Sequence, residues 1–195
     1  IQQDGLSASL STFNAIILTL SEDIHKMKEW FQLMLEHEIQ PNIVTINTLM
    51  HAAVLAEGEK AAQYWFDKAK SLNVVVDAVT YNSIISALSK RVARRFTDTP
   101  GGVRNSRNDN RENRSDIIED VNVISQWLNA MREAGFQPYL ATYTELFTAH
   151  GFLQSARGKS SIESLWQEMA RDGIRPDLKC YTAVLTAHAR CFNID

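Results

Sequence analysis

The chain is poor in cysteine, glycine and positive charge, and each shortage excludes a class of protein. Its two cysteines, Cys180 and Cys191, fit neither a zinc site nor a disulfide framework, so we expect them to be packing residues. Its eight glycines form no phosphate-cradling loop. No apolar run approaches the ~18 residues that a membrane-spanning helix needs. The net charge is −3, whereas proteins that are held on nucleic acid by phosphate contacts usually have an excess of basic residues.

The histidines are not arranged for catalysis either. All five are scattered along the chain. His150 and His188 are 38 residues apart and occupy the same position of a repeating pattern, so repetition explains them better than metal binding does. The sequence contains neither a nucleophile elbow nor a metal-binding cluster of Cys and His. We therefore expect no enzyme activity, no metal and no cofactor.

A short phrase that returns along the chain predicts its architecture. In each copy a threonine, or once a cysteine, is followed by an aromatic residue or isoleucine and then by Asn or Thr. The phrase begins at Thr12, Thr45, Thr80, Thr142 and Cys180, with spacings of 33, 35, 62 and 38 residues. A period near 35 residues indicates stacked helical repeats.

Each later phrase follows a turn and opens a helix. Pro41, Pro138 and Pro176 stand shortly before three of the phrases, and Val76 takes that place before the fourth. Because proline cannot continue a helix, these steps are predicted turns. The threonine, or a residue beside it, is then placed to cap the new helix.

The residues before each turn predict a second helix. Apolar side chains at spacings of three and four form one helix face, which includes all four tryptophans. Gly135 and Gly173 fall just past the helix end, where a left-handed C-cap is common, and Glu38 and Asn73 fill that place in the other repeats. The predicted fold is all-α. Its first helices span 11–21, 44–56, 79–94, 141–153 and 179–191, and its second helices span 22–37, 58–72, 118–134 and 160–172.

The chain resembles the pentatricopeptide repeat family in the segments IQPNIVTINTLMHA, VVVDAVTYNSIISALSK, FQPYLATYTELFTAH and IRPDLKCYTAVLTAH. The tetratricopeptide repeat has a similar period but places a Trp in its first helix, whereas all four tryptophans here lie in second helices. The resemblance implies a right-handed superhelical α-solenoid of helix-turn-helix repeats over residues 10–195, after a partial upstream segment at 1–9. Its units are 10–42, 43–77, 78–139, 140–177 and the partial unit 178–195.

The two ends of the chain predict a fragment of a longer protein. The sequence begins with Ile1 rather than Met, and the last unit lacks its second helix. A final helix without its partner leaves an apolar side uncovered, contrary to the capping that solenoids need.

The third unit is long because residues 96–115, FTDTPGGVRNSRNDNRENRS, interrupt it. This polar stretch has no helical periodicity, which predicts a disordered insertion. It is either a tolerated surface loop, since long loops cost little closure entropy, or a basic arm that contacts RNA phosphate or an acidic partner. The candidate phosphate contacts are Arg104, Arg107, Arg111 and Arg114.

The resemblance also implies which residues read RNA, because proteins of this kind read one base per repeat. In the family, the fifth and last residues of a unit contact the base edge, and the second residue packs between bases. The base-reading residues are then Asn14 with Asn42, Asn47 with Asp77, Asn82 with Tyr139, Thr144 with Asp177, and Thr182. The base-packing residues are Ser11, Val44, Val79, Ala141 and Lys179.

The implied bases are a pyrimidine for unit one, uracil for unit two and guanine for unit four. Tyr139 departs from the family pattern, so unit three has no assigned base. A second interpretation stands beside this one. A single Asn at a helix start often caps or bonds locally, and a single Thr on an inward face often packs.

The expected function is sequence-selective binding of single-stranded RNA in a mitochondrion or chloroplast, in RNA processing, stability or translation. The alternative is an α-solenoid scaffold for other proteins, or a subunit of an organellar ribonucleoprotein. The negative net charge, the low repeat count and the irregular unit lengths favour this alternative. Neither a membrane nor a small-molecule substrate is an expected partner.

Overall fold

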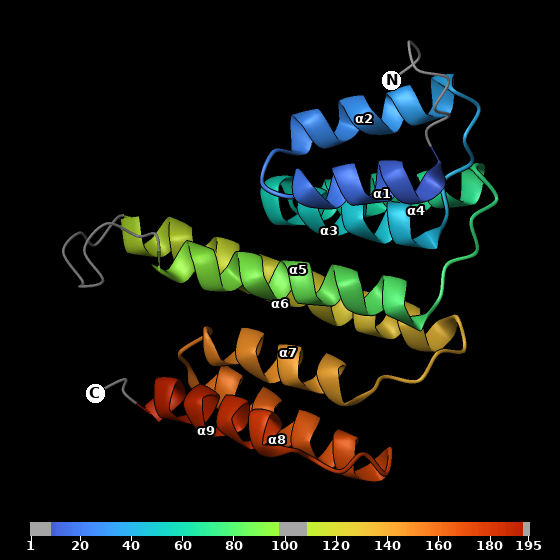
Figure 1. The fold of residues 1–195 in the computed structure, drawn as a ribbon. Coiled ribbons are helices and arrows are strands. Elements are labelled where there is room, and N and C mark those ends of the chain that lie inside the picture. Colours follow the sequence, from blue (N-terminus) through green and yellow to red (C-terminus); the bar gives the residue numbers. More distant parts are fainter. Residues whose placement is uncertain (1–8, 98–108, 193–195) are drawn as a thin grey trace. The chain divides into compact units, whose positions relative to one another are not determined.

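The computed structural model describes residues 9–97 and 109–192, which form nine α-helices and no strand. The prediction of an all-α repeat fold is confirmed. The helices are α1 (Leu10–Thr19), α2 (Ile24–Glu36), α3 (Ile43–Glu57), α4 (Glu59–Ser71), α5 (Ala78–Thr97), α6 (Asp109–Glu133), α7 (Leu140–Gly151), α8 (Ala156–Arg171) and α9 (Leu178–Phe192). Figure 1 labels them along the ribbon.

The chain divides into two compact units, Ile1–Ile84 and Ile85–Asp195, with the division inside α5. No helix among the described residues is long and apolar enough to cross a membrane. The same residues contain no group of three or more His, Cys, Asp or Glu side chains that could hold a metal ion.

The first compact unit is built from two helical pairs. Helix α1 packs on α2, and α3 packs on α4, while α3 also contacts both α1 and α2 (Figure 1). Aromatic side chains fill the core: the rings of Phe31 and Trp65 meet edge to face at 5.2 Å, and those of Phe66 and Tyr81 at 5.4 Å. Trp65 is only 2% exposed, so this tryptophan is a core residue, as its place on the apolar face of the second helix indicates.

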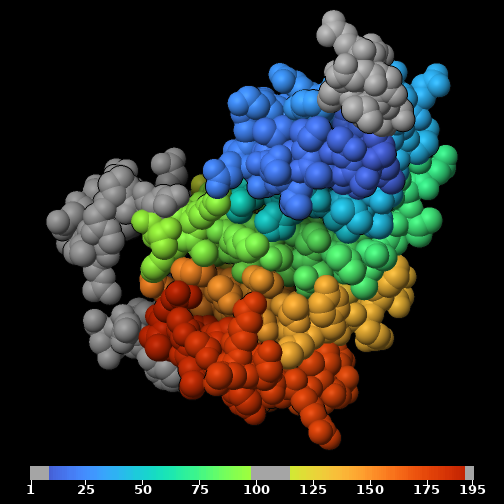
Figure 2. Space-filling view, in the orientation of Figure 1, coloured from blue at the N-terminus to red at the C-terminus, as the bar shows by residue number. Residues whose placement is uncertain are grey.

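The second compact unit packs α7 against both α8 and α9. Its largest fully buried side chains are Tyr143 and Phe147 of α7. Cys180 and Cys191 are both buried free thiols, as their predicted packing role requires. The space-filling view shows one face of each compact unit, coloured by residue number along the chain (Figure 2).

The four turns that end α2, α4, α6 and α8 share one backbone conformation. Glu38, Asn73, Gly135 and Gly173 have φ values of 57°, 55°, 84° and 71°, which confirms the predicted left-handed C-caps. In each turn the following backbone N–H donates to a carbonyl five residues earlier. The N···O distances are 3.1 Å (Ile39 to Met34), 2.9 Å (Val74 to Ala69), 3.0 Å (Phe136 to Met131) and 3.1 Å (Ile174 to Met169).

The structure differs from the sequence prediction at both ends of the expected insertion, residues 96–115. Phe96 and Thr97 belong to α5, and α6 begins at Asp109, so both ends are helical rather than disordered. Residues 109–115 contain neither Gly nor Pro, so nothing stops the helix that buries Ile117 and Val121 from extending towards its N-terminus. Residues 98–108 lie outside the described part of the chain.

Candidate nucleic-acid interface

The last residue of each complete unit is the N-cap of the next helix, and in units one, two and four its side chain forms a cap. Its side-chain oxygen accepts a hydrogen bond from the backbone N–H three residues later, which satisfies one of the free donors at a helix start. The N···O distances are 3.1 Å (Thr45 N to Asn42 Oδ1), 2.9 Å (Thr80 N to Asp77 Oδ1) and 2.7 Å (Cys180 N to Asp177 Oδ1). The sequence placed the cap at the threonine or beside it; the capping side chain stands three residues before it.

The recurring threonine completes the same cap from the other side. Thr45, Thr80 and Thr142 are each at most 1% exposed. Each hydroxyl oxygen accepts from the backbone N–H of the residue that ends the preceding unit, at 3.2 Å for Asn42, 3.3 Å for Asp77 and 3.3 Å for Tyr139. At Asn42 and Asp77, whose side chains also accept from the threonine N–H, this reciprocal arrangement is a capping box. The bond that the threonine hydroxyl accepts is common to all three sites and explains why threonine recurs in the phrase.

In unit one the two predicted base-reading residues touch. Asn14 Nδ2 donates to Asn42 Oδ1 at 3.3 Å, and both side chains are half-buried. The hydroxyl of Thr45 donates to Asn14 Oδ1 at 2.6 Å. No pattern in the sequence predicts this third contact, because Thr45 belongs to the next unit and lies 31 residues from Asn14.

Unit two ends in an aspartate, Asp77, where unit one ends in Asn42, and its hydrogen-bond pattern differs. The hydroxyl of Thr80 donates to Asp77 Oδ1 at 3.0 Å. Asn47 is half-buried, and its Oδ1 has no hydrogen-bond partner among the described residues. A buried acceptor without a donor is uncommon, so the carboxamide of Asn47 retains unused hydrogen-bonding capacity.

The remaining base-reading candidates are less alike. Thr144 is 5% exposed, and its hydroxyl donates to the Leu140 carbonyl oxygen at 2.8 Å. Thr182 is exposed, and its hydroxyl donates to the Leu178 carbonyl oxygen at 2.8 Å. Asn82 and Tyr139, the predicted pair of unit three, belong to different compact units, so each is placed only within its own.

The predicted base-packing residues lie at the surface. Val44 and Val79 are 55% and 53% exposed, although valine is usually buried. Ser11, Ala141 and Lys179 are also exposed. Val44 and Asn47 are three residues apart in α3, so they lie on one face of that helix. An exposed apolar side chain therefore stands beside a polar one that has unused hydrogen-bonding capacity.

The basic residues near the predicted insertion are partly neutralised. Arg95 of α5 contacts Asp116 at 2.5 Å and Asp120 at 3.0 Å, and Arg91 lies 3.9 Å from Asp120. Burial raises the pKa of Asp120, and the two guanidinium groups oppose that rise. Of the candidate phosphate contacts, Arg104 and Arg107 lie outside the described residues, as do the side chains of Arg111 and Arg114 in α6.

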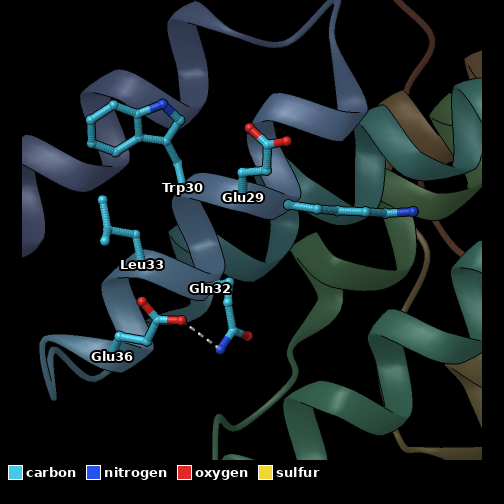
Figure 3. A pocket seen from close by; sticks show the side chains of 6 residues that line it. Glu29, Trp30, Gln32, Leu33 and Glu36 are labelled. Carbon is cyan, nitrogen blue, oxygen red and sulfur yellow. Dashed lines mark hydrogen bonds between the residues drawn. The ribbon is translucent and has the colours of Figure 1, made fainter.

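A hollow on the surface of α2 lies outside this constellation. It is lined by Lys28, Glu29, Trp30, Gln32, Leu33 and Glu36. Figure 3 shows these side chains around the hollow, with Gln32 Nε2 donating to Glu36 Oε1 at 3.3 Å. All of them come from one helix, so none of the predicted base-reading residues contributes to it.

Comparison with known proteins supports the repeat architecture. A model of the pentatricopeptide repeat domain matches residues 29–91 and 164–193. The structure of the pentatricopeptide repeat protein PPR10 in complex with an 18-nt psaJ RNA element is similar, with a TM-score of 0.69 and 22% sequence identity. A cysteine-to-serine variant of PPR10 with the same RNA element gives the same values. No curated protein sequence matches the chain.

The likeness to PPR10 covers 97% of this chain but only 23% of the length of PPR10. A further structure of PPR10, from maize, has a TM-score of 0.42 and 20% identity, and covers 99% of this chain and 34% of that one. At an identity of 22%, the similarity establishes an all-α repeat solenoid as the fold.

Proposed function

Because this chain belongs to the pentatricopeptide repeat family, we propose that it binds single-stranded RNA sequence-selectively and reads one base with each unit. The structures of PPR10 with an RNA element support this proposal. We place the activity in organellar RNA processing, stability or translation, in a mitochondrion or chloroplast. The role is one of binding rather than catalysis.

The observation that carries the proposal is the recurrence of one surface arrangement in the first compact unit. An exposed valine stands three residues before a half-buried asparagine twice, as Val44 with Asn47 and as Val79 with Asn82. The apolar side chain can pack on the face of a base, and the carboxamide can bond to its edge. Single-stranded bases offer both surfaces when they are unstacked.

The proposed bases follow from the side-chain chemistry. A carboxamide has a donor and an acceptor, so Asn47 can match uracil, which carries an N–H donor between two carbonyl acceptors. Thr144 uses its hydroxyl hydrogen on Leu140, so the hydroxyl oxygen remains to accept from the N–H groups of guanine. Because Thr144 is only 5% exposed, we expect weaker discrimination at unit four than at unit two.

Selection from a randomised RNA pool, combined with a salt titration, tests the proposal. A binder that reads bases should enrich a motif with uracil and guanine two positions apart. The substitution Asn47→Thr should then shift the preference at one nucleotide from uracil towards guanine. Asn129→Thr is the matched control, since Asn129 is an exposed residue of α6 outside the base-reading positions. An N47T variant that selects the same motif as the wild type would contradict the assigned positions.

The second candidate function is a scaffold for other proteins. The net charge of −3 favours it, as do the ion pairs that hold Arg91 and Arg95 against acidic side chains. This reading predicts no enriched RNA motif and a stable protein partner in a pull-down with the full-length protein. It also predicts that RNA affinity disappears at moderate salt, since only unspecific phosphate contacts would remain.

A further inference from the structure

We infer that Thr45 is a positioning residue for base reading by unit one, although it belongs to unit two. The inference rests on the proposed function and adds a residue outside the predicted base-reading and base-packing sets. Thr45 would act through Asn14, by deciding which atoms of the Asn14 carboxamide remain available to a base.

The hydrogen bonds around Asn14 form a chain that begins in the backbone. The backbone N–H of Thr45 donates to Asn42 Oδ1 at 3.1 Å, which fixes the orientation of the Asn42 carboxamide. That oxygen accepts from Asn14 Nδ2 at 3.3 Å. The hydroxyl of Thr45 donates to Asn14 Oδ1 at 2.6 Å, and its oxygen accepts from the Asn42 backbone N–H at 3.2 Å.

This chain permits only one orientation of the Asn14 carboxamide. A half-turn of the amide would place Asn14 Oδ1 against Asn42 Oδ1, and two acceptors would then face each other. Asn42 cannot turn to relieve that contact without breaking the cap on α3. Thr45 is 1% exposed, so its hydroxyl hydrogen cannot bond to water instead. The hydroxyl oxygen lies 2.6 Å from Asn14 Oδ1 and 3.0 Å from Asn42 Oδ1, and the shorter contact places the hydrogen on Asn14.

The fixed orientation determines which hydrogen-bonding groups Asn14 offers to a base. Asn14 Oδ1 already accepts a short hydrogen bond, whereas Nδ2 has two hydrogens and uses one of them on Asn42. The side chain therefore presents mainly a donor. Both pyrimidines offer acceptors to a donor, at N3 and O2 in cytosine and at O2 and O4 in uracil. A donor alone cannot use the N3–H group by which uracil differs from cytosine.

Unit two provides an internal comparison. Thr80 occupies the place of Thr45 and is 0% exposed. Its hydroxyl lies 3.0 Å from Asp77 Oδ1, as that of Thr45 lies 3.0 Å from Asn42 Oδ1, but the acceptor in unit two is a carboxylate. A carboxylate attracts the hydroxyl hydrogen more strongly than a neutral amide oxygen does. Asn47 Oδ1 consequently accepts no hydrogen bond from the described residues. The uncommitted but buried oxygen of Asn47 can accept from the N3–H of uracil once the side chain turns outward, whereas the committed oxygen of Asn14 suits either pyrimidine.

The test compares Thr45→Val, which removes the hydroxyl at nearly constant shape, with Thr45→Ser, which keeps it. Affinities are measured for two single-stranded RNAs that carry the motif enriched by the wild type and differ only in C or U opposite unit one. We expect T45V to shift the affinity ratio towards U by about fivefold, because the freed Asn14 Oδ1 can then accept one hydrogen bond from the N3–H of uracil. The affinity ratio of T45S should stay within about twofold of the wild-type ratio.

Thr80→Val is the matched control. It removes a buried capping hydroxyl at the equivalent place in unit two, but that hydroxyl does not contact the fifth residue of its preceding unit. The C-to-U ratio at unit one should therefore not change in T80V, even if both valine variants lose similar stability. A ratio in T45V equal to that of the wild type would overturn the inference while leaving the proposed function intact. A wild type that selects no base at any position would instead overturn the proposed function, and with it this inference.

Discussion

Gly151 at the end of α7 lies so close to α9 that a Cβ added to it would be 2.7 Å from both the Cα and the Cβ of Ala187. A Cβ atom in a folded protein essentially never comes within 3.0 Å of a heavy atom of another, non-neighbouring residue. The two helices therefore meet through their smallest side chains, which allows the backbones of α7 and α9 to approach closely.

Gly151→Ala should destabilise the protein by about 1–3 kcal/mol, because the added methyl group forces α7 and α9 apart. Helix propensity alone predicts the opposite sign, a gain of about 1 kcal/mol. The free energy of unfolding from urea titration decides between the two. Adding Ala187→Gly to G151A should recover part of the loss, since it removes one of the two clashing atoms. A G151A variant more stable than the wild type would contradict the close approach.

Glu38→Gly should stabilise the protein by about 0.5–1 kcal/mol. Glu38 has a φ of 57°, in the left-handed region that costs a residue with a Cβ about 1–2 kcal/mol, while glycine loses part of that gain to its greater freedom when unfolded. Asn73→Gly should gain less, because asparagine tolerates this region better than glutamate. Thermal unfolding measures both variants.

Gly173→Ala is the control for this pair. An added Cβ at Gly173 would meet nothing within 4 Å, so any loss reports the backbone conformation alone. We expect a loss of about 1 kcal/mol. A G173A variant as stable as the wild type would mean that the left-handed turns carry no conformational cost.

His150 should make the protein less stable in mild acid. Burial, together with the positive charge of Arg157, lowers the pKa of His150 from 6.5 to about 4. The stability that depends on keeping His150 neutral is therefore fully present above pH 6.5. It is lost as the pH falls towards 4, because the unfolded chain binds the proton at a higher pH than the folded chain does. The loss is on the order of 3 kcal/mol. It is measured as the difference in unfolding free energy between pH 7.5 and 4.5.

The variant His150→Leu should remove most of that pH dependence. His150 Nδ1 is buried without a hydrogen-bond partner among the described residues, so an apolar side chain of similar size leaves no donor unpaired. Asp120 acts in the opposite sense. Its raised pKa contributes stability at low pH that is lost as the pH rises. An H150L variant with the full acid sensitivity of the wild type would exclude His150 as its cause.

Tyr139→Asp should stabilise the second compact unit. Tyr139 stands at the N-cap of α7 with extended backbone (φ −124°, ψ 176°), and its backbone N–H already donates to Thr142. An aspartate there can accept from N–H groups of the first turn, which is worth about 1 kcal/mol and about 2–4 °C in Tm. Tyr139→Ala removes the ring without adding a cap and should not gain stability.

Local signals in the sequence predicted the helical pairs and their turns. The turns can be located from the prolines and from the positions of Glu38, Asn73, Gly135 and Gly173. The backbone conformation at these positions is set locally, by residues that are close in the sequence. The long helix α6 was missed at its start, since residues 109–115 lack apolar periodicity and are helical as an extension of the turns that bury Ile117 and Val121. A polar composition alone does not distinguish such an extension from a loop.

The candidate interface was predictable only in part. The equivalent places of Asn14 and Asn47 follow from the repeat period. Their different hydrogen bonds do not follow from it, because they depend on which acceptor takes the hydroxyl hydrogen of the next unit's threonine. That acceptor is the carboxamide of Asn14 in unit one and the carboxylate of Asp77 in unit two. The burial of Thr144 likewise depends on tertiary packing that no single repeat encodes.

The caps at the unit ends set a rule for exchanging repeats between proteins of this kind. The side chain that closes one unit also starts the next helix, as Asn42 does for α3 and Asp177 for α9. A cassette cut after Asn42 would carry away the cap of the helix that stays behind. A cut on the N-terminal side of Asn42 keeps each cap with its helix, so modular grafts should be joined there.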